Sequence, residues 1–568
     1  MGIYPVVEAR AQVPAALESA RQRDLTDVET REPQLAYLFK HVITQEVAYE
    51  QLLFEQRQRL HRAAAEWYEH GKGGPLEPLY PLIAHHWEHA GERERAINAL
   101  ERAGELALSS FANREALEFF CRAAELDTAG DESPALRRGR WARALGDAYA
   151  RLGMLTESVQ SLSDAMALMG YALPRTGLGI VMGLCSQIGR QVWRRYRGLP
   201  KPREYNRELT LEVVNTYGEL GLAAWYDANP LLMMYTTFKA LNLAEEVGPS
   251  PEVARLKAAL AVMLSSVPMH ATADKYAREA IEMAEKFEHG RSTARAHQYY
   301  GAFLIGVGRY DEVPVHAAAA MKASESIGNE RGVEEAINNE IYVHMARAEY
   351  DQVLEKADRM AASARRRQDE QVVFWANIHC AEAYWQLGEL AEAQAVLRNM
   401  APEAESDVTV VKRYWALQVH VAIEQQQLEE AFEIATKRLL PLQRPATVVE
   451  VRGFTAVAAL HLARWEQGIT AAGRPAQTAC RRLSSAAKLF PMCEASALYY
   501  EAACQRLAGR PTKAHGLLLN ALSVAHRRGE RREAMLICEA LVPMSSGHER
   551  DRHDLDAKAL RAAITQRS

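Results

Sequence analysis

A repeat with a period of 40 residues is the feature that most constrains how this chain folds. Similar blocks begin at Gly290, Glu330 and Glu370. Each block has a small residue near its middle, an apolar residue two positions later and another three positions after that. These residues are Gly308, Tyr310 and Val313; Ala348, Tyr350 and Val353; and Gly388, Leu390 and Ala393. Self-similarity of this kind is typical of solenoids in which each repeat is one supersecondary unit.

The composition predicts that the repeats are helical. Alanine, leucine, glutamate and arginine dominate, and segments with the pattern of strands are nearly absent. The chain has 568 residues, 48% of them hydrophobic and 25% charged, so it is folded but far too long for one compact core. We therefore predict an all-α solenoid of helical hairpins. Each repeat is expected to contact only its neighbours, so that removal of the residues after Ser545 should cost little stability.

The blocks resemble tetratricopeptide (TPR) repeats, which pair two antiparallel helices. The residues that match are Ala84, Trp87, Gly91, Ala96 and Ala103; Leu145, Gly146, Tyr149, Gly153 and Ala165; and Ala381, Tyr384, Gly388 and Ala393. Small residues recur where the two helices cross, because larger side chains would push them apart. Since TPR repeats usually have a period of about 34 residues, the longer period here implies longer helices or turns.

The TPR resemblance also implies a binding surface, because the first helix of each such hairpin lines a concave groove. Counting from the small crossing residue gives the candidate partner-binding positions Arg143, Asp147, Gln298, Asn338, Tyr342, Glu382 and Trp385. This mixture of charges, amides and aromatic rings suits a peptide or a protein helix better than a phosphate chain.

The segment 37–71 resembles the junction between a P-loop ATPase module (AAA or STAND type) and a TPR-like tail in bacterial multidomain proteins. The matching stretches are 39–41 (FKH), 45–49 (QEVAY), 59–61 (RLH) and 64–67 (AAEW). In that family the first part closes a winged-helix-like lid, and many members carry a class III adenylate or guanylate cyclase domain. The ATPase and cyclase domains would lie upstream of Met1 and are absent here. The resemblance therefore implies either a separately encoded module or a truncated relative.

These patterns predict six segments, one of them a basic insert. They are an N-terminal segment (1–36), the junction-like helical segment (37–74), TPR-like repeats (75–170), a Pro/Gly-flanked insert (171–206), further repeats of about 40 residues (207–545) and a polar tail (546–568). The insert carries the cations Arg190, Arg194, Arg195, Arg197, Lys201 and Arg203. A basic amphipathic element can touch a membrane surface or an acidic partner. We instead favour a helix packed on the solenoid, because the apolar part is short and rich in glycine.

No catalytic, cofactor-binding or metal-binding motif can be recognised. The chain has no phosphate-binding GxxxxGK[ST], no GxSxG, no HExxH and no glycine-rich dinucleotide turn. His85 and His89 lie one helical turn apart, but a metal would need a third ligand that faces the same way. Since they flank the repeat residues Trp87 and Gly91, we predict a structural role for them, no metal and no cofactor.

Charge and targeting signals point to the cytoplasm and away from nucleic acid. The net charge is −5 and the pI is about 6.4, so there is no overall basic footprint. Seven cysteines are scattered singly, which suits a reducing compartment. The N-terminus does not match a secretory signal, and the longest apolar run, 177–185, is far shorter than the roughly 20 residues that span a bilayer.

Three functional hypotheses follow. The first is a non-catalytic scaffold or sensor that binds a protein or small effector and regulates a cyclase–ATPase signalling protein. The second is the scaffold part of an ATPase–TPR transcriptional regulator, although the C-terminal region offers only a weak helix-turn-helix candidate. The third is a remnant of a cyclase or ATPase, or an enzyme whose site is assembled from scattered residues. The missing motifs and the acidic pI favour the first.

Overall fold

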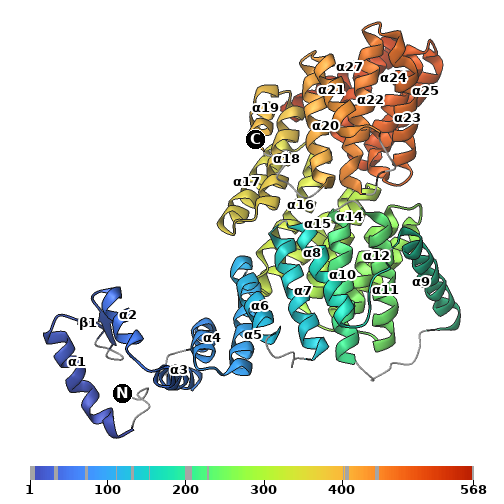
Figure 1. The fold of residues 1–568 in the computed structure, drawn as a ribbon. Coiled ribbons are helices and arrows are strands. Elements are labelled where there is room, and N and C mark those ends of the chain that lie inside the picture. The colour runs from blue at the N-terminus through green and yellow to red at the C-terminus, as the bar shows by residue number, and fades with distance from the viewer. Residues whose placement is uncertain are drawn as a thin grey trace. The chain divides into compact units, whose positions relative to one another are not determined.

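The computed structural model describes most of the chain. The described residues are 7–30, 36–70, 75–110, 112–128, 134–152, 154–174, 176–198, 207–226, 229–400, 402, 408–441, 445 and 447–565. Nearly all of them lie in helices, which confirms the all-α prediction (Figure 1). They form two compact units. Unit 1 comprises Met1–Leu152 and Gln160–Gly170, and unit 2 comprises Gly153–Val159 and Tyr171–Ser568.

Unit 1 begins with a mixed segment and continues as helical hairpins. Its elements are η1 (Val7–Gln12), α1 (Val13–Gln22), β1 (Thr26–Thr30), β2 (Ala36–Phe39), α2 (Val42–Glu50), α3 (Phe54–Glu69), η2 (Glu77–Leu79), α4 (Tyr80–His89), α5 (Arg93–Ser109), α6 (Asn113–Thr128), α7 (Ala135–Arg151) and most of α8 (Leu155–Leu168). The core of the hairpins surrounds Trp87, which is fully buried and donates a hydrogen bond from Nε1 to Glu69 at 2.7 Å.

The start of the junction-like segment differs from its prediction as a helix. Tyr37–Phe39 belongs to β2, which pairs antiparallel with β1 so that Tyr37 lies opposite Val28 and Leu38 opposite Asp27. The extended backbone is stabilised by the hydrogen bonds of this ladder, which a helical pattern cannot reveal. A helix followed by a two-stranded sheet accommodates a winged-helix-like lid, but that interpretation stays a prediction.

Unit 2 is a succession of helical hairpins. Its helices are α9 (Gly177–Arg197), α10 (Arg207–Tyr226), α11 (Pro230–Val247), α12 (Pro251–Ser265), α13 (His270–Lys286), α14 (Gly290–Val307), α15 (Val313–Ser326), α16 (Glu330–Ala346), α17 (Tyr350–Arg366), α18 (Glu370–Leu387), α19 (Leu390–Arg398), α20 (Val408–Glu424), α21 (Leu428–Ile434), α22 (Val451–Glu466), α23 (Gly473–Ala487), α24 (Glu494–Leu507), α25 (Pro511–Arg528), α26 (Arg531–Leu541) and α27 (Gly547–Thr565). Short 3-10 or π turns join them: η3 (Tyr310–Glu312), η4 (Ala435–Leu439), η5 (Val448–Glu450), η6 (Thr470–Ala472), η7 (Pro491–Cys493) and η8 (Val542–Met544).

The 40-residue repeat coincides with these hairpins. The first helices α14, α16 and α18 start at the residues that open the three similar blocks. Gly308 and Gly388 end α14 and α18 in the left-handed conformation, with φ of +74° and +82°. Glycine tolerates this conformation without the steric cost that a side chain brings. Val313 and Val353, on the second helices, are fully buried where the paired helices meet.

The expectation that each repeat contacts only its neighbours is wrong, because the C-terminal hairpins of unit 2 pack back onto its middle hairpins. His270 Nε2 lies 2.9 Å from the carbonyl oxygen of Leu489, and the guanidinium of Arg531 lies 3.5 Å from Glu349. Ile564 joins the hydrophobic cluster of α16, α17 and α18. A solenoid that curves enough brings distant repeats together, and the curvature is the sum of small rotations that no single repeat reveals.

The segment predicted as a polar tail forms the packed helix α27. Ala557 lies in the core shared with α25 and α26, and Ile564 is buried against the middle hairpins. The polar residues that dominate this segment face solvent, so its overall composition hides a narrow apolar stripe.

The basic insert contains α9, which packs on α11. Arg194 Nη2 donates to Glu246 at 2.6 Å, and its Nη1 lies 3.3 Å from Glu245. Arg190 also reaches Glu246, at 3.4 Å. Lys201 and Arg203 lie outside the described residues. Within the described part of the chain, no helix is long and apolar enough to cross a membrane. These contacts match a helix packed on the solenoid.

Candidate functional site

The first helices of unit 2 surround a cavity of about 210 Å³. Its walls come from α10, α11, α12, α14, α16, α18, α20 and η5, so helices from six successive hairpins contribute. The lining is rich in aromatic side chains, which are Trp225, Tyr226, Tyr299, Tyr342 and Trp375. Concave sites that combine apolar walls with a few polar groups are typical of ligand-binding pockets.

The charged groups at one end of the cavity are paired with each other. Arg295 Nη1 donates to Glu335 Oε2 at 3.1 Å, and Arg331 Nε lies 3.6 Å from the other oxygen of that carboxylate. Arg331 also donates from Nη1 to Asp369 at 2.8 Å. Gln298 donates a further hydrogen bond to Glu335. Because the guanidinium groups are satisfied within the wall, this end presents no net demand for an anion.

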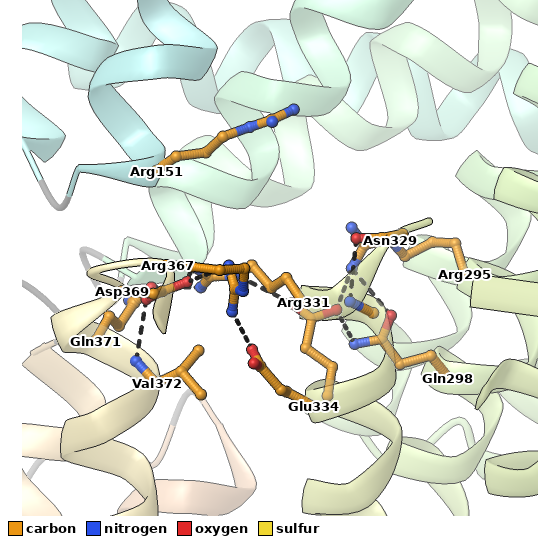
Figure 2. A network of polar contacts seen from close by, with 12 residues as sticks. Arg151, Arg295, Gln298, Asn329, Arg331, Glu334, Arg367, Asp369, Gln371 and Val372 are labelled. Carbon is orange, nitrogen blue, oxygen red and sulfur yellow. Dashed lines mark hydrogen bonds and ion pairs between the residues drawn. The ribbon is translucent and has the colours of Figure 1, made fainter. Parts of the chain in front are cut away.

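The same ion pairs connect the starts of consecutive first helices, as Figure 2 shows. Asp369 accepts from the backbone N–H of Val372 at 3.2 Å and so caps α18. Arg367 lies between Asp369 and Glu334, the latter only 1% exposed. One network thus caps a helix and bridges neighbouring hairpins, which holds this wall of the cavity in one arrangement.

The other end of the cavity is formed by a chain of polar groups that ends on Asn338. Arg413 Nη2 lies 3.1 Å from His379 Nδ1, and His379 Nε2 lies 2.7 Å from Asn338 Oδ1. An arginine nitrogen can only donate, so His379 Nδ1 accepts and its Nε2–H donates to Asn338. Burial and the adjacent guanidinium hold the pKa of His379 well below its ordinary value, which keeps the ring neutral.

This arrangement leaves two donors for a bound molecule. The carbonyl oxygen of Asn338 is used by His379, so its Nδ2 group can donate into the cavity that it lines. The buried Nε1–H of Trp375 has no hydrogen-bond partner among the described residues. A buried donor without an acceptor is costly, and a ligand oxygen would satisfy it.

Glu382 anchors the polar chain from behind. Its carboxylate accepts from Arg413 Nη2 at 2.6 Å and from Arg452 Nε at 2.7 Å, while Arg413 Nη1 donates to Tyr342 at 3.1 Å. Burial alone would raise the pKa of Glu382, but the two guanidinium groups outweigh it and hold that pKa far below its ordinary value. Arg413 is thereby fixed against the cavity.

A second, smaller pocket of about 70 Å³ lies on the other side of this ion pair. Tyr342, Glu382, Arg413 and Arg452 line it together with Glu530, from the start of α26. Both carboxylate oxygens of Glu530 are buried without a hydrogen-bond partner among the described residues. Burial and the neighbouring Glu533 raise the pKa of Glu530 well above its ordinary value.

The structure brings together four of the seven predicted groove residues. Gln298, Asn338 and Tyr342 line the cavity, and Glu382 supports it through Arg413. Trp385 is instead buried beside it, with its ring stacked on His420 at a centroid distance of 4.4 Å.

The other two predicted residues belong to unit 1. Arg143 and Asp147 lie on α7, where Asp147 is paired with Arg151 at 2.8 Å. The structure therefore does not assign them to the cavity of unit 2, and their role as partner-binding residues stays a prediction.

Several cavity residues were missed from the sequence although their spacing holds a signal. Arg295, Glu335 and Trp375 recur at intervals of 40 residues, and so do Asn339 and His379. The period that identifies the hairpins also places these side chains at one height of the inner wall. Arg413 could not be found in this way, because the spacing changes between α18 and α20.

Comparisons with known proteins give no relative by sequence. No protein-family model matches the chain, and no curated protein matches it. Among solved structures, the chain is similar to one described as the APC/C hetero-tetramer Cut9–Hcn1, with a TM-score of 0.43, 12% identity and coverage of 93% of this chain and 98% of that one. It is also similar to yeast Tom70, with a TM-score of 0.32, 13% identity and coverage of 90% and 97%. At these scores the assignment of a TPR-like hairpin solenoid rests on the structure itself.

Proposed function

We propose that this chain is a non-catalytic sensor and scaffold module whose cavity in unit 2 binds a small effector or a segment of a protein partner. The observation that carries the proposal is the cavity itself, which joins the inner helices of six hairpins around one enclosed space. A ligand that contacts several repeats at once stabilises the arrangement in which it fits, and it can thus change how the module presents its outer surfaces.

The chemistry of the wall narrows the class of ligand. Aromatic rings favour a flat apolar body, and the donors on Asn338 and Trp375 favour an oxygen acceptor such as a carbonyl or carboxylate. The guanidinium of Arg295 is already neutralised by Glu335, so a phosphate chain would find little excess positive charge.

We further propose that occupancy of the cavity regulates a signalling protein of the P-loop ATPase or cyclase type. The resemblance of the segment 37–71 to an ATPase-to-TPR junction supports this partner. The exposed apolar side chains of Val42, Ile43 and Val47 on α2 also support it, because contiguous apolar surface marks many protein contacts.

The test compares two tryptophan substitutions in the chain captured from its own cells with an antibody. Ala302→Trp places a large ring in the cavity lining, whereas Ala318→Trp adds the same ring on the exposed face of α15 and is the matched control. Native mass spectrometry detects bound small molecules, and peptide mass spectrometry detects a P-loop or cyclase partner.

We expect a bound species with the wild type and with Ala318→Trp, and its loss with Ala302→Trp. A wild-type chain that carries no bound species, or an Ala302→Trp chain that retains everything the wild type carries, would contradict the proposal.

A further inference from the structure

Three histidines from two helices of unit 1 converge on one point. His61 lies on α3, and His85 and His86 lie on α4. Each offers one ring nitrogen, and these nitrogens all lie within 4.8 Å of one another. His89, on the last turn of α4, places its ring 5.0 Å from that of His61 and 4.1 Å from that of His85. The third inward-facing ligand that His85 and His89 lacked in the sequence comes from α3.

The hydrogen bonds around His61 leave the ring nitrogen that faces the cluster available to an ion. The hydroxyl of Tyr49 lies 2.8 Å from His61 Nε2, on the side away from His86. If Nε2–H donates to this oxygen, His61 Nδ1 carries the lone pair. An outer partner that fixes the tautomer in this way is typical of metal-bound histidines.

The closest pair of nitrogens has nearly the spacing of two ligands. His61 Nδ1 and His86 Nδ1 are 2.9 Å apart. Two nitrogens bound tetrahedrally to Zn²⁺ at about 2.0–2.1 Å lie about 3.3 Å apart, so a small rotation of one ring makes room. Without an ion, these two nitrogens must share one proton.

The rings are also in the protonation state that a metal needs. Burial, with a further contribution from neighbouring histidines, lowers the pKa of His61 and of His86 to about 4. The pKa of His85 is lowered for the same reason. Neutral imidazoles bind metal without first losing a charge, and only the proton shared by His61 and His86 has to leave.

We propose that His61, His85 and His86 form a binding site for Zn²⁺ or a similar divalent first-row ion, with His89 as a further imidazole at its edge. Imidazole nitrogen is a preferred ligand of these ions. His85 is exposed, so an ion can enter from solvent. Because the ligands come from α3 and α4, a bound ion ties these two helices together at the start of the helical hairpins.

The test uses the full chain without a polyhistidine tag, stripped of metal by a chelator and titrated with Co²⁺. We expect one equivalent to bind with the intense visible absorption of four-coordinate Co²⁺, and Zn²⁺ to displace it. His61→Gln should weaken binding by at least about 100-fold. Tyr49→Phe, which removes only the outer partner, should weaken it by about tenfold.

Two controls keep the result assignable. His70→Gln, at the exposed end of α3, removes a histidine outside the cluster and should leave the titration unchanged. The described residues contain one other group with metal-ligand spacing, Cys538, His553 and Asp556, and Cys538→Ala tests it. A thiolate ligand would also add a near-ultraviolet charge-transfer band, which the histidine site lacks.

The proposal is overturned if the stripped chain fails to bind Co²⁺ at millimolar concentration. It is also overturned if His61→Gln and Tyr49→Phe, both with wild-type circular dichroism, bind as tightly as the wild type, or if binding is lost with Cys538→Ala instead. A protonated histidine pair that only holds α3 against α4 would give the first of these results.

Discussion

The carboxylate of Glu382 is the group on which the support of the cavity depends most. It is 1% exposed and pairs with Arg413 on α20 and with Arg452 on α22. Glu382→Gln keeps the size and shape of the side chain but removes its charge. Two buried guanidinium groups then lose their counter-charge, which is far more costly than the loss of a surface pair.

The magnitude follows from this burial. Removal of one partner from a buried ion pair typically costs about 3–5 kcal/mol of unfolding free energy. We expect a value in this range for Glu382→Gln at pH 7, since the glutamine oxygen can still accept one of the hydrogen bonds. Glu392→Gln is the matched control, because Glu392 is exposed at the start of α19 and its loss should change stability by less than about 0.5 kcal/mol.

The sign of the pH dependence gives a second readout. The pKa of Glu382 is lowered in the folded state from an ordinary value of 4.5, so its contribution is fully present above that pH. As the pH falls below 4.5 towards the folded pKa, the wild type loses this contribution and approaches the stability of Glu382→Gln. The two curves should therefore converge in acid and diverge at neutral pH.

Urea unfolding followed by circular dichroism measures the free energies, and hydrogen exchange with mass spectrometry localises the effect. Peptides from α18, α20 and α22 should lose protection first in Glu382→Gln. Equal stability of the Glu382 and Glu392 variants at pH 7, or loss of protection elsewhere, would refute the assigned role of this carboxylate.

Four further predictions concern backbone geometry, packing and a buried acid. Gln368 is exposed with φ of +56°, so Gln368→Gly should raise the unfolding free energy by about 0.5–1 kcal/mol in a urea titration. Gly388→Leu should lower it by about 1–2 kcal/mol, because φ is +82° although no atom would clash with the new Cβ. Truncation after Ser545 removes α27 and the buried Ile564, so calorimetry should show a loss of at least about 2 kcal/mol. Glu530 has a raised pKa, so its penalty grows as the pH rises above 4.5, and Glu530→Gln should be more stable than the wild type at pH 7 but not at pH 4.

The repeat could be predicted from the sequence because its cause is local. Gly308 and Gly388 end helices wherever they occur, and Val313 and Val353 mark the buried side of the second helix. The same period placed Asn338 correctly on the inner wall. These features depend on residues within one hairpin, so one repeat is enough to reveal them.

The closure of unit 2 and the histidine cluster could not be predicted, because they depend on residues far apart in the sequence. Nothing near Ile564 indicates that it packs with α16 to α18. His61 and His86 are separated by 25 positions, and their contact depends on how α3 crosses α4. The strand β2 was missed for the same reason, since its partner β1 lies in a segment without a strand pattern of its own.

A crystal structure of the chain isolated from its own cells, purified without denaturant, tests the central claim most directly. The account predicts electron density for a bound molecule or peptide between Arg295 and Asn338, with an acceptor oxygen near Trp375 Nε1. A cavity that contains only ordered water, with Trp375 and Asn338 hydrogen-bonded to it, would contradict the proposal that this space is a binding site.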